Sequence, residues 1–264
     1  MINTLQTTTN KPALLLVDDH REILDFLADD LQEHYQVFTA NDGREALNFL
    51  ADESVQLIIS DIMMPVMDGY ALCETIKSTV EYCHIPVILL TAKNTLQSKI
   101  QGLELGADAY VEKPFSPEYL QVQIANLLAN RNKLREYFAS SPLVHIKTMA
   151  HSKSDELFLE KLNDLIHQRL ENPNLDVEHL ADLMCMSRPT LYRKIKAISN
   201  LTPNELINVA RLKRAAELLA EGGLKIYEIA EMVGYSSQTH FGRNFHKQFG
   251  VSPSEYIENL KQRN

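Results

Sequence analysis

The first half of the chain alternates between short apolar runs and stretches with helical spacing, and this alternation constrains the fold most strongly. Five apolar runs are each followed by a segment whose apolar residues recur every three or four positions. The runs are almost continuously apolar, which is typical of parallel strands covered on both faces. The sequence therefore predicts a doubly wound α/β domain of five βα units. The expected strands are 13–19, 35–40, 55–60, 85–92 and 108–113, and the expected helices are 21–33, 44–51, 70–78, 96–105 and 117–129.

Polar side chains stand at the ends of four of these expected strands. Asp18 and Asp19 end the first strand, Asp61 the third, Thr91 the fourth and Lys113 the fifth. Ligands of doubly wound sheets bind at this edge. Clustered carboxylates repel one another unless a cation neutralises them, and Mg²⁺ suits such oxygen ligands. A carboxylate can also attack a phosphoryl group, whose oxygens a metal, a hydroxyl and an ammonium can then stabilise.

The second half of the chain contains a helical pattern that occurs twice. LADLMCMSRPTLYRKIK, from Leu180, aligns with IAEMVGYSSQTHFGRNF, from Ile229, at an offset of 49. Each copy is expected to form a helix, a tight turn and a second helix, which is a helix-turn-helix pattern. The expected supporting helices are 177–184 and 226–232, the expected recognition helices are 188–198 and 237–248, and a stiff helix over 204–220 joins the two copies.

The two expected recognition helices carry side chains suited to DNA. The first contains RPTLYRKIK, in which four basic residues, Lys194 among them, occur without an acid. Arg can bind guanine bidentately, Gln reads adenine, and Lys and Ser more often contact phosphate. Two such units could enter successive major-groove segments about 34 Å apart. The predicted DNA-contacting residues are Ser187, Arg188, Pro189, Thr190, Tyr192, Arg193, Lys196, Ser237, Gln238, Thr239, His240, Arg243 and Lys247.

Charge is divided unevenly along the 264 residues. Residues 1–130 carry 7 Lys and Arg against 19 Asp and Glu, whereas residues 131–264 carry 19 against 16. The acidic half cannot be a general polyanion binder, and the second half needs local basic clusters to contact nucleic acid. No run of about 18 apolar residues occurs, so we expect no direct membrane contact in this segment. The three scattered cysteines indicate a reducing, cytoplasmic setting.

The polar residues at the strand ends resemble those of the receiver domain of response regulators. The resemblance covers about residues 11–130, and the matching motifs are VDD at 17–19, SDIMMPVMDG at 60–69, TA at 91–92 and KPF at 113–115.

This resemblance implies a role for each matching position. Asp61 would accept a phosphoryl group from a histidine kinase, and the Lys113–Pro114 peptide bond would be cis. The implied ligands of Mg²⁺ are Asp18, Asp19, Asp61 and the backbone carbonyl of Met63. The residues implied to contact the phosphoryl oxygens, or to respond to them as a switch, are Thr91, Lys113 and Tyr110, the last being the switch.

The second half resembles the DNA-binding domain of the AraC/XylS regulators over about residues 155–262. The matching segments are LADLMCMSRPTLYRKIKAI, RLKRAAELL and EIAEMVGYSSQTHFGRNFHKQFGVSPSEY. The whole chain is also similar to the C-terminal part of Bacteroidetes hybrid two-component sensors, in which case it is the cytoplasmic portion of a membrane protein. The expected organisation is a flexible leader at 1–10, a receiver domain at 11–130, a linker at 131–154 and the DNA-binding domain at 155–264.

Together the resemblances imply a two-component response regulator. Its binding to double-stranded promoter DNA would be controlled by phosphorylation of Asp61, and it would form a homodimer when phosphorylated. It would not be an enzyme beyond slow self-dephosphorylation. One alternative is a pseudo-receiver on a constitutive DNA-binding protein. The other is an aspartyl-phosphate phosphohydrolase, whose nucleophile usually lies on the first strand in a D-x-D pattern that Asp18-Asp19-His20 lacks.

Overall fold

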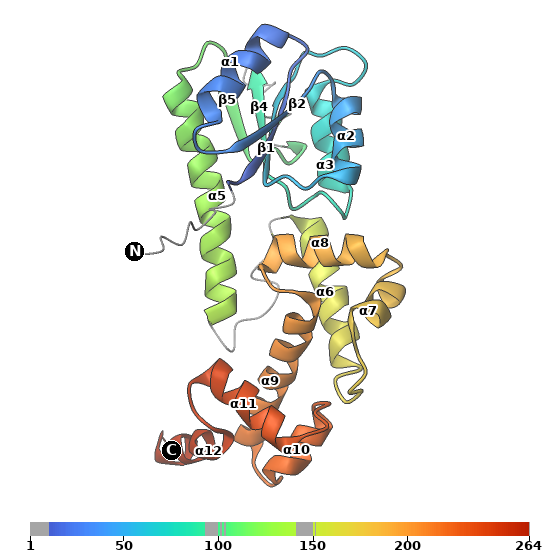
Figure 1. The fold of residues 1–264 in the computed structure, drawn as a ribbon, viewed down its shortest axis with the longest axis vertical. Coiled ribbons are helices and arrows are strands. Elements are labelled where there is room, and N and C mark those ends of the chain that lie inside the picture. Colours follow the sequence, from blue (N-terminus) through green and yellow to red (C-terminus); the bar gives the residue numbers. More distant parts are fainter. Residues whose placement is uncertain are drawn as a thin grey trace, which may run out of the picture. The chain divides into compact units, whose positions relative to one another are not determined.

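The computed structural model describes residues 11–92, 100, 102, 104–140, 150 and 152–263, which fall into two compact units (Figure 1). The first unit is Met1–Arg131 and the second is Asn132–Asn264, and we describe each by itself. The expected leader at 1–10 lies outside the described residues, as do most of the helix expected over 96–105 and much of the expected linker.

The first unit is built on a five-stranded parallel sheet, as predicted. The strands are β1 (Ala13–Val17), β2 (Gln36–Ala40), β3 (Leu57–Asp61), β4 (Val87–Thr91) and β5 (Ala109–Glu112), and their order in the sheet is β2-β1-β3-β4-β5. The direction of winding reverses between β1 and β3, so the ends of these two strands flank the crevice where ligands of such sheets bind. The described helices of this unit are α1 (Arg21–Leu31), α2 (Gly43–Asp52), α3 (Gly69–Ser78) and the part of α5 (Pro117–Ser140) that precedes Asn132.

Helices cover both faces of the sheet because alternate residues of each strand point to opposite sides. Leu14 and Leu16 of β1 belong to a core that includes side chains of α1 and α5. Leu15 and Val17 belong to the opposite core, which includes side chains of α2 and α3. All five residues of β1, β3 and β4 are buried, which explains their continuously apolar sequence.

Helix α5 runs to Ser140 and so continues into the segment expected to be a linker. Arg131, which is 5% exposed, ties it to the sheet, because its Nη2 lies 3.3 Å from Oδ1 of Asp108, just before β5. Lys77 of α3 contacts the other oxygen of Asp108 at 2.6 Å. Burial raises the pKa of Asp108, but Lys77 and Arg131 outweigh burial and hold it below its ordinary value.

The second unit is helical throughout its described residues. Its helices are α6 (Lys153–His167), α7 (Val177–Met184), α8 (Arg188–Ser199), α9 (Pro203–Glu221), α10 (Ile226–Met232), α11 (Gln238–Phe249) and α12 (Pro253–Arg263). Side-chain oxygens cap the starts of both recognition helices, since Ser187 accepts a hydrogen bond from the amide of Thr190 and Ser237 from that of His240. Among the described residues, no helix is both long and apolar enough to cross a bilayer.

Each helix-turn-helix pair has its own core, and α9 contributes to both. In the first, Leu191 and Ile195 of α8 pack with α6, α7 and Leu206 of α9. In the second, Phe241 and Phe245 of α11 pack with Leu212 and other residues from the later part of α9. The two predicted helix-turn-helix patterns are therefore confirmed, and one helix connects their cores.

Candidate functional site

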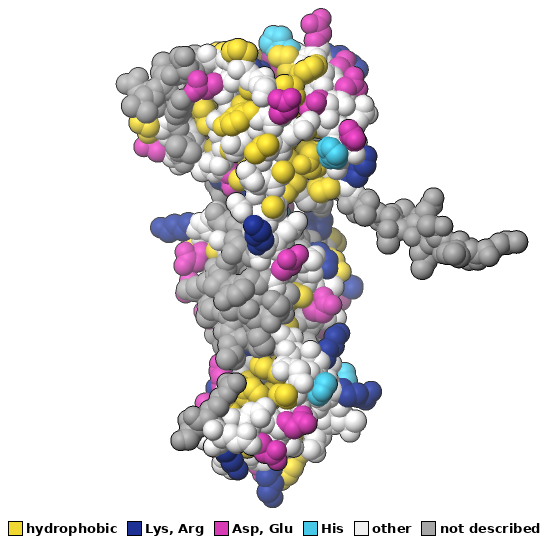
Figure 2. All heavy atoms as spheres, turned by 90° about the vertical axis from the view of Figure 1, so that its left-hand side faces the viewer, with side chains coloured by type: hydrophobic (Ala, Val, Ile, Leu, Met, Phe, Trp, Pro, Cys, Tyr) yellow, Lys and Arg dark blue, Asp and Glu magenta, His cyan; other side chains and the backbone are white. Residues whose placement is uncertain are grey.

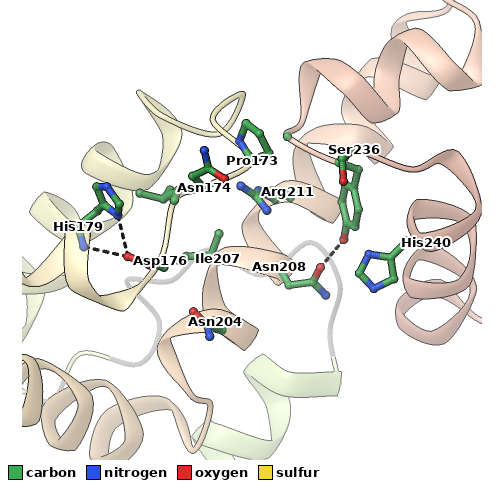
Figure 3. Close-up of a pocket in the computed structure, with 13 residues that line it drawn as sticks. Pro173, Asn174, Asp176, His179, Asn204, Ile207, Asn208, Arg211, Ser236 and His240 are labelled. Carbon is green, nitrogen blue, oxygen red and sulfur yellow. Dashed lines mark hydrogen bonds and ion pairs between the residues drawn. The ribbon is translucent and has the colours of Figure 1, made fainter.

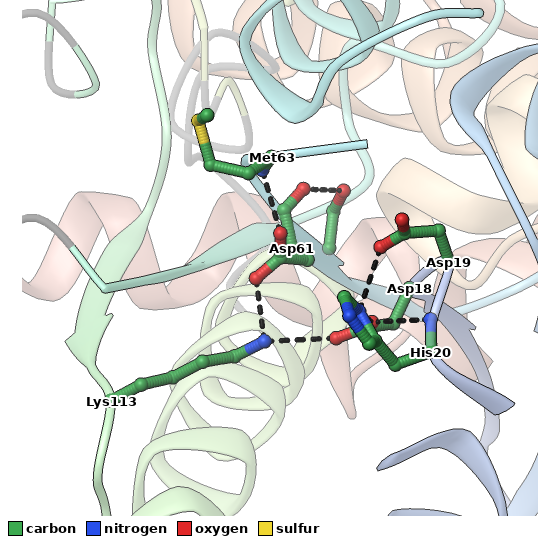
Figure 4. A network of polar contacts seen from close by, with 7 residues as sticks. Asp18, Asp19, His20, Asp61, Met63 and Lys113 are labelled. Carbon is green, nitrogen blue, oxygen red and sulfur yellow. Dashed lines mark hydrogen bonds and ion pairs between the residues drawn. The ribbon is translucent and has the colours of Figure 1, made fainter. Parts of the chain in front are cut away.

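Side chains from three strand ends meet at one edge of the sheet (Figure 4). The Nζ of Lys113 lies 2.9 Å from Oδ2 of Asp18 and 2.6 Å from Oδ1 of Asp61. The two acids are 1% and 6% exposed. Burying two carboxylates is costly without a positive partner, and the lysine supplies that charge. The predicted convergence of these three residues is therefore observed.

The backbone of the sheet and its loops positions the site. The amide of Lys113 donates to the carbonyl of Thr91 at 2.7 Å, which holds the lysine at the end of β4. The amide of Met63 donates to Oδ2 of Asp61 at 2.6 Å, so the backbone of Met63 lies against this carboxylate. The Met63 side chain is 58% exposed and points away from the core. The Lys113–Pro114 peptide bond is cis, as expected.

Gly69 lets helix α3 begin directly against the site. A Cβ atom at this position would lie 2.1 Å from the carbonyl oxygen of Asp61 and 2.9 Å from Cα of Ile62. No side chain fits within these distances of rigid backbone. The amide of Gly69 donates to the carbonyl of Ile62 at 3.0 Å, which fixes the loop that follows Asp61. The motif SDIMMPVMDG thus ends in glycine because of this close approach.

His20 joins the acids at the end of β1, although we did not predict it as a site residue. Its Nδ1 lies 2.9 Å from Asp19 and 3.2 Å from Asp18, and the three residues can bring ligand atoms within 4.8 Å of one another. A hydrogen bond to Asp18 and the charge of Asp19 raise the pKa of His20 above its ordinary value. Its position directly after Asp18 and Asp19 was the available signal.

The ammonium of Lys113 is held in its charged form. Burial lowers its pKa, but hydrogen bonds from Lys113 to Asp61 and Asp18, together with their charges, outweigh this effect and raise the pKa above the ordinary lysine value. The site therefore keeps a fixed positive charge between the acids at neutral pH.

Thr91 and Tyr110 occupy the expected strands. Thr91 ends β4 and is 2% exposed. Tyr110, in β5, is half-buried, packs on the α2–α3 side of the sheet, and has its hydroxyl 3.4 Å from that of Tyr70 in α3. We did not anticipate Tyr70, because only the fold brings it to a residue 40 positions later.

Most predicted DNA-contacting residues lie on the surfaces of the two recognition helices. Arg193 and Thr190 are partly exposed. The exposed residues are Ser187, Arg188, Pro189, Tyr192, Lys196, Ser237, Gln238, Thr239, His240, Arg243 and Lys247. Lys194, a basic residue of the same segment that was not among the predicted DNA contacts, faces the core. It is 1% exposed, and its Nζ pairs with Oδ1 of Asp155 in α6 and lies 5.4 Å from the centre of the Phe158 ring.

Comparisons with known proteins agree with both halves of this description. Residues 14–125 match the response regulator receiver domain, and residues 180–259 match a helix-turn-helix domain. "Histidine kinase P4" of Formosa agariphila is 38% identical over 255 residues, which are 97% of this chain and 19% of that protein. "Probable transcriptional regulator ycf27" of Cyanophora paradoxa is 44% identical over 120 residues, 45% of this chain and 49% of that protein. A solved receiver domain of a signal transduction histidine kinase from Syntrophus aciditrophicus is 38% identical, covers 45% of this chain and 91% of its own, and has a TM-score of 0.43.

These matches define a chain in which a receiver domain precedes a DNA-binding domain. Its two matched regions are a response regulator receiver domain and, after it, a helix-turn-helix domain. The chain spans 19% of the length of the first of these relatives and about half of the second.

Proposed function

We propose that this chain is a two-component response regulator whose binding to promoter DNA is controlled by phosphorylation of Asp61. The observation that carries the proposal is Lys113, which bridges buried Asp18 and Asp61 beside the point where the sheet changes its direction of winding. Ligands of doubly wound sheets bind at this edge, and a cluster of titratable groups in such a place is a candidate functional site. Here Asp19 stands next to the pair and is partly exposed.

The donor atoms at this edge fit Mg²⁺. The residues that would hold the ion are Asp18, Asp19, Asp61 and the backbone carbonyl of Met63, which offer the hard oxygen ligands that Mg²⁺ prefers. Asp18 and Asp61 already share a cation, Lys113, so their arrangement tolerates positive charge between them. When bound, Mg²⁺ would supply charge neutralisation at the transferring phosphoryl group.

Phosphoryl transfer would proceed at the carboxylate of Asp61. A carboxylate oxygen forms a bond to phosphorus as the bond between phosphorus and the donor's histidine nitrogen breaks, and the histidine keeps that electron pair. Lys113, now 2.6 Å from Asp61, and the Met63 amide, also 2.6 Å away, are placed to donate to phosphoryl oxygens. Thr91, at the end of the adjacent strand, would add its hydroxyl.

A histidine kinase domain is the proposed donor, either as a separate protein or upstream in the same chain, as in a hybrid sensor. Exposed apolar side chains on α1 and α5 of the same unit support docking of such a partner. Phe26 of α1 is 58% exposed, and Tyr119 and Val122 of α5 are 49% and 55% exposed. Figure 2 shows apolar side chains gathered among acidic ones on the face of the first unit that it presents.

The added phosphoryl group, near −2 in charge, would change the balance between two states of the receiver. We propose that Thr91 and Lys113 move toward it, that Tyr110 follows, and that the altered face then forms a homodimer. Two recognition helices per chain would then enter successive major-groove segments of double-stranded promoter DNA in the cytoplasm.

Asp61→Asn tests the phosphorylation step. With a labelled phosphodonor such as acetyl phosphate, the wild-type chain should incorporate label, and the variant should incorporate none. Asp52→Asn, at an exposed position of α2, removes the same charge outside the site and should label normally. Stoichiometric labelling of Asp61→Asn would refute the assignment.

Footprinting on genomic DNA fragments tests the control of DNA binding. Protection should increase when the wild-type chain is treated with phosphodonor or BeF₃⁻, and should stay at its basal level in Asp61→Asn. Equal protection in every condition would leave a constitutive DNA-binding protein with a pseudo-receiver.

A further inference from the structure

The second unit contains a cleft of about 560 Å³ that spans its two helix-turn-helix pairs (Figure 3). One wall is the loop before α7 and the start of α7, the floor is α9, and the other wall is the turn between α10 and α11. Its polar lining residues are Asn174, Asp176, His179, Asn204, Asn208, Arg211, Tyr235, Ser236 and His240. A cleft of this size and polarity is suited to a polar ligand group.

Arg211 gives the cleft a positive charge that no described carboxylate neutralises. Its Nη2 donates to the backbone carbonyl of Asn172 at 2.6 Å, while its Nε is buried and has no hydrogen-bond partner. Burial lowers the pKa of Arg211 from its ordinary value, which agrees with a desolvated guanidinium. A buried donor left unpaired is costly. Because the guanidinium lines the cleft, an anion bound there would compensate its uncancelled charge.

The chain holds the guanidinium tightly in place. Gly234, with φ at +78°, sits above it, and a Cβ there would lie 2.9 Å from Nη2 of Arg211 and 2.2 Å from the carbonyl of Leu170. The one carboxylate among the lining residues, Asp176, is already engaged, because it accepts hydrogen bonds from the amide and Nδ1 of His179 at 3.0 and 2.8 Å. The ligand expected here is therefore an anion.

We propose that this cleft binds a phosphate group, presented by the DNA strand that passes between the two recognition helices. This inference rests on the proposed DNA binding. His240 and Ser236 line the cleft at the exposed start of α11, the end of the recognition helix that would face DNA. Arg, Asn and Ser side chains and helix starts make most phosphate contacts in protein–DNA complexes. A free organic or inorganic phosphate offers the same chemistry, and the test separates the two sources.

Asn204→Asp is the decisive variant. Asn204 is exposed and lies in the first turn of α9, where a carboxylate stabilises a helix, so the variant should fold. The new charge should repel phosphate from the cleft. Asn259→Asp is the matched control, since it adds the same charge at an exposed position of α12 outside the lining. Arg211→Gln is a second variant, used with a measurement of its unfolding because Arg211 also holds the loop at Asn172.

The first measurement is DNA affinity of the full chain as a function of salt, on a mixed-sequence duplex. Asn204→Asp should weaken binding by about 3- to 10-fold at low salt, regardless of sequence, and should reduce the slope of log affinity against log salt by about 1. Asn259→Asp should change neither quantity. Equal effects of the two variants would overturn the proposal.

The second measurement separates the sources of phosphate. On a footprinted duplex, single neutral methylphosphonate linkages between the two protected segments should weaken binding by the wild-type chain but not by Asn204→Asp. Inorganic phosphate, titrated without DNA and followed by NMR, should shift His240 and Arg211 in the wild-type chain only. If phosphate causes NMR shifts but the methylphosphonate linkages have no effect, the cleft binds a free phosphate and not the DNA strand. If neither effect is seen, the proposal of a phosphate site is refuted. A chain that binds no DNA but shows the phosphate shifts would refute the proposed function and leave the cleft as a phosphate site.

Discussion

Each unit of this chain buries a lysine against aspartate, and the two pairs differ in what surrounds them. Lys113 lies between Asp18 and Asp61, its side chain is 22% exposed, and a further acid and a histidine stand beside it. Lys194 is 1% exposed, and its Nζ meets Asp155 and the ring of Phe158. The first pair, which we call the open pair, borders solvent. It has further oxygen ligands beside it, which suits the binding of an exchangeable ion. The second pair, the enclosed pair, is buried and joins helix α8 to helix α6.

The largest effect we expect comes from breaking the enclosed pair. Lys194→Ala leaves the carboxylate of Asp155 buried without its ammonium, which costs about 3–5 kcal/mol in the free energy of unfolding of the second unit. Hydrogen exchange of amides in α8 measures this loss for that unit alone. Lys161→Ala, at an exposed position of α6, should stay within about 0.5 kcal/mol of wild type.

Replacing both members of the enclosed pair tests whether the unpaired charge of Asp155 causes the loss of stability in Lys194→Ala. Lys194→Met with Asp155→Leu removes both buried charges, and most of the lost stability should return because desolvation is no longer required. If the double variant were as unstable as Lys194→Ala, the ion pair would stabilise the fold by more than the free energy that burying its two charges costs.

Breaking the open pair should cost less, and Mg²⁺ should compensate for it. Lys113→Ala leaves Asp18 and Asp61 repelling each other, at about 1–3 kcal/mol, between the values for exposed and fully buried pairs. A divalent ion bound to these acids stabilises the folded state by about 2.7 kcal/mol at 100 times its Kd. Hydrogen exchange of β1 and β3 with and without Mg²⁺ measures the recovery. Mg²⁺ should not rescue Lys194→Ala, and rescue of that variant would contradict the distinction between the pairs.

Sequence reasoning found the open pair and did not find the enclosed one, for physical reasons. The ends of parallel strands meet at one edge, so Asp18, Asp61 and Lys113 could be placed together without knowing any distance. Lys194 was noted as a basic residue of the first recognition helix and was left out of the predicted DNA contacts, but its buried partner was not predicted. Its spacing indicated burial, because it lies three residues after Leu191 and four before Ile198, both buried.

Other features depend on contacts that no local pattern specifies. Asp155 precedes Lys194 by 39 positions, and the cleft around Arg211 joins residues from the loop before α7 to α11. The close approach of Gly69 to the carbonyl of Asp61 likewise emerges only from the packing of α3. The elements themselves were predictable because strand and helix periodicity is local.

The open pair should also impose a dependence on alkaline pH. The pKa of Lys113 is raised in the folded state, so its stabilising contribution is complete below the ordinary lysine value of about 10.4 and is lost as pH rises through the folded value. The difference in unfolding free energy between wild type and Lys113→Met should therefore be constant from pH 7 to about pH 9 and shrink above about pH 10.4. Urea unfolding followed by circular dichroism measures it, since the chain has no Trp. If the difference in unfolding free energy between wild type and Lys113→Met grew as the pH rose, the raised pKa of Lys113 would be contradicted.

The smallest effect is expected at Met63, where only the backbone faces the open pair. Its amide binds Asp61 at 2.6 Å, while its side chain is 58% exposed. Met63→Ala removes the side chain and keeps both the amide and the carbonyl proposed as a metal ligand. The affinity for Mg²⁺, titrated by hydrogen exchange or calorimetry, should stay within about twofold of wild type, since surface substitutions shift free energies by less than about 0.5 kcal/mol. Asp19→Asn, which removes a proposed oxygen ligand, should weaken the same titration at least tenfold, as expected from loss of a charged ligand worth about 1.4 kcal/mol or more. A strong effect of Met63→Ala would mean that the exposed side chain, and not the backbone, shapes the metal site.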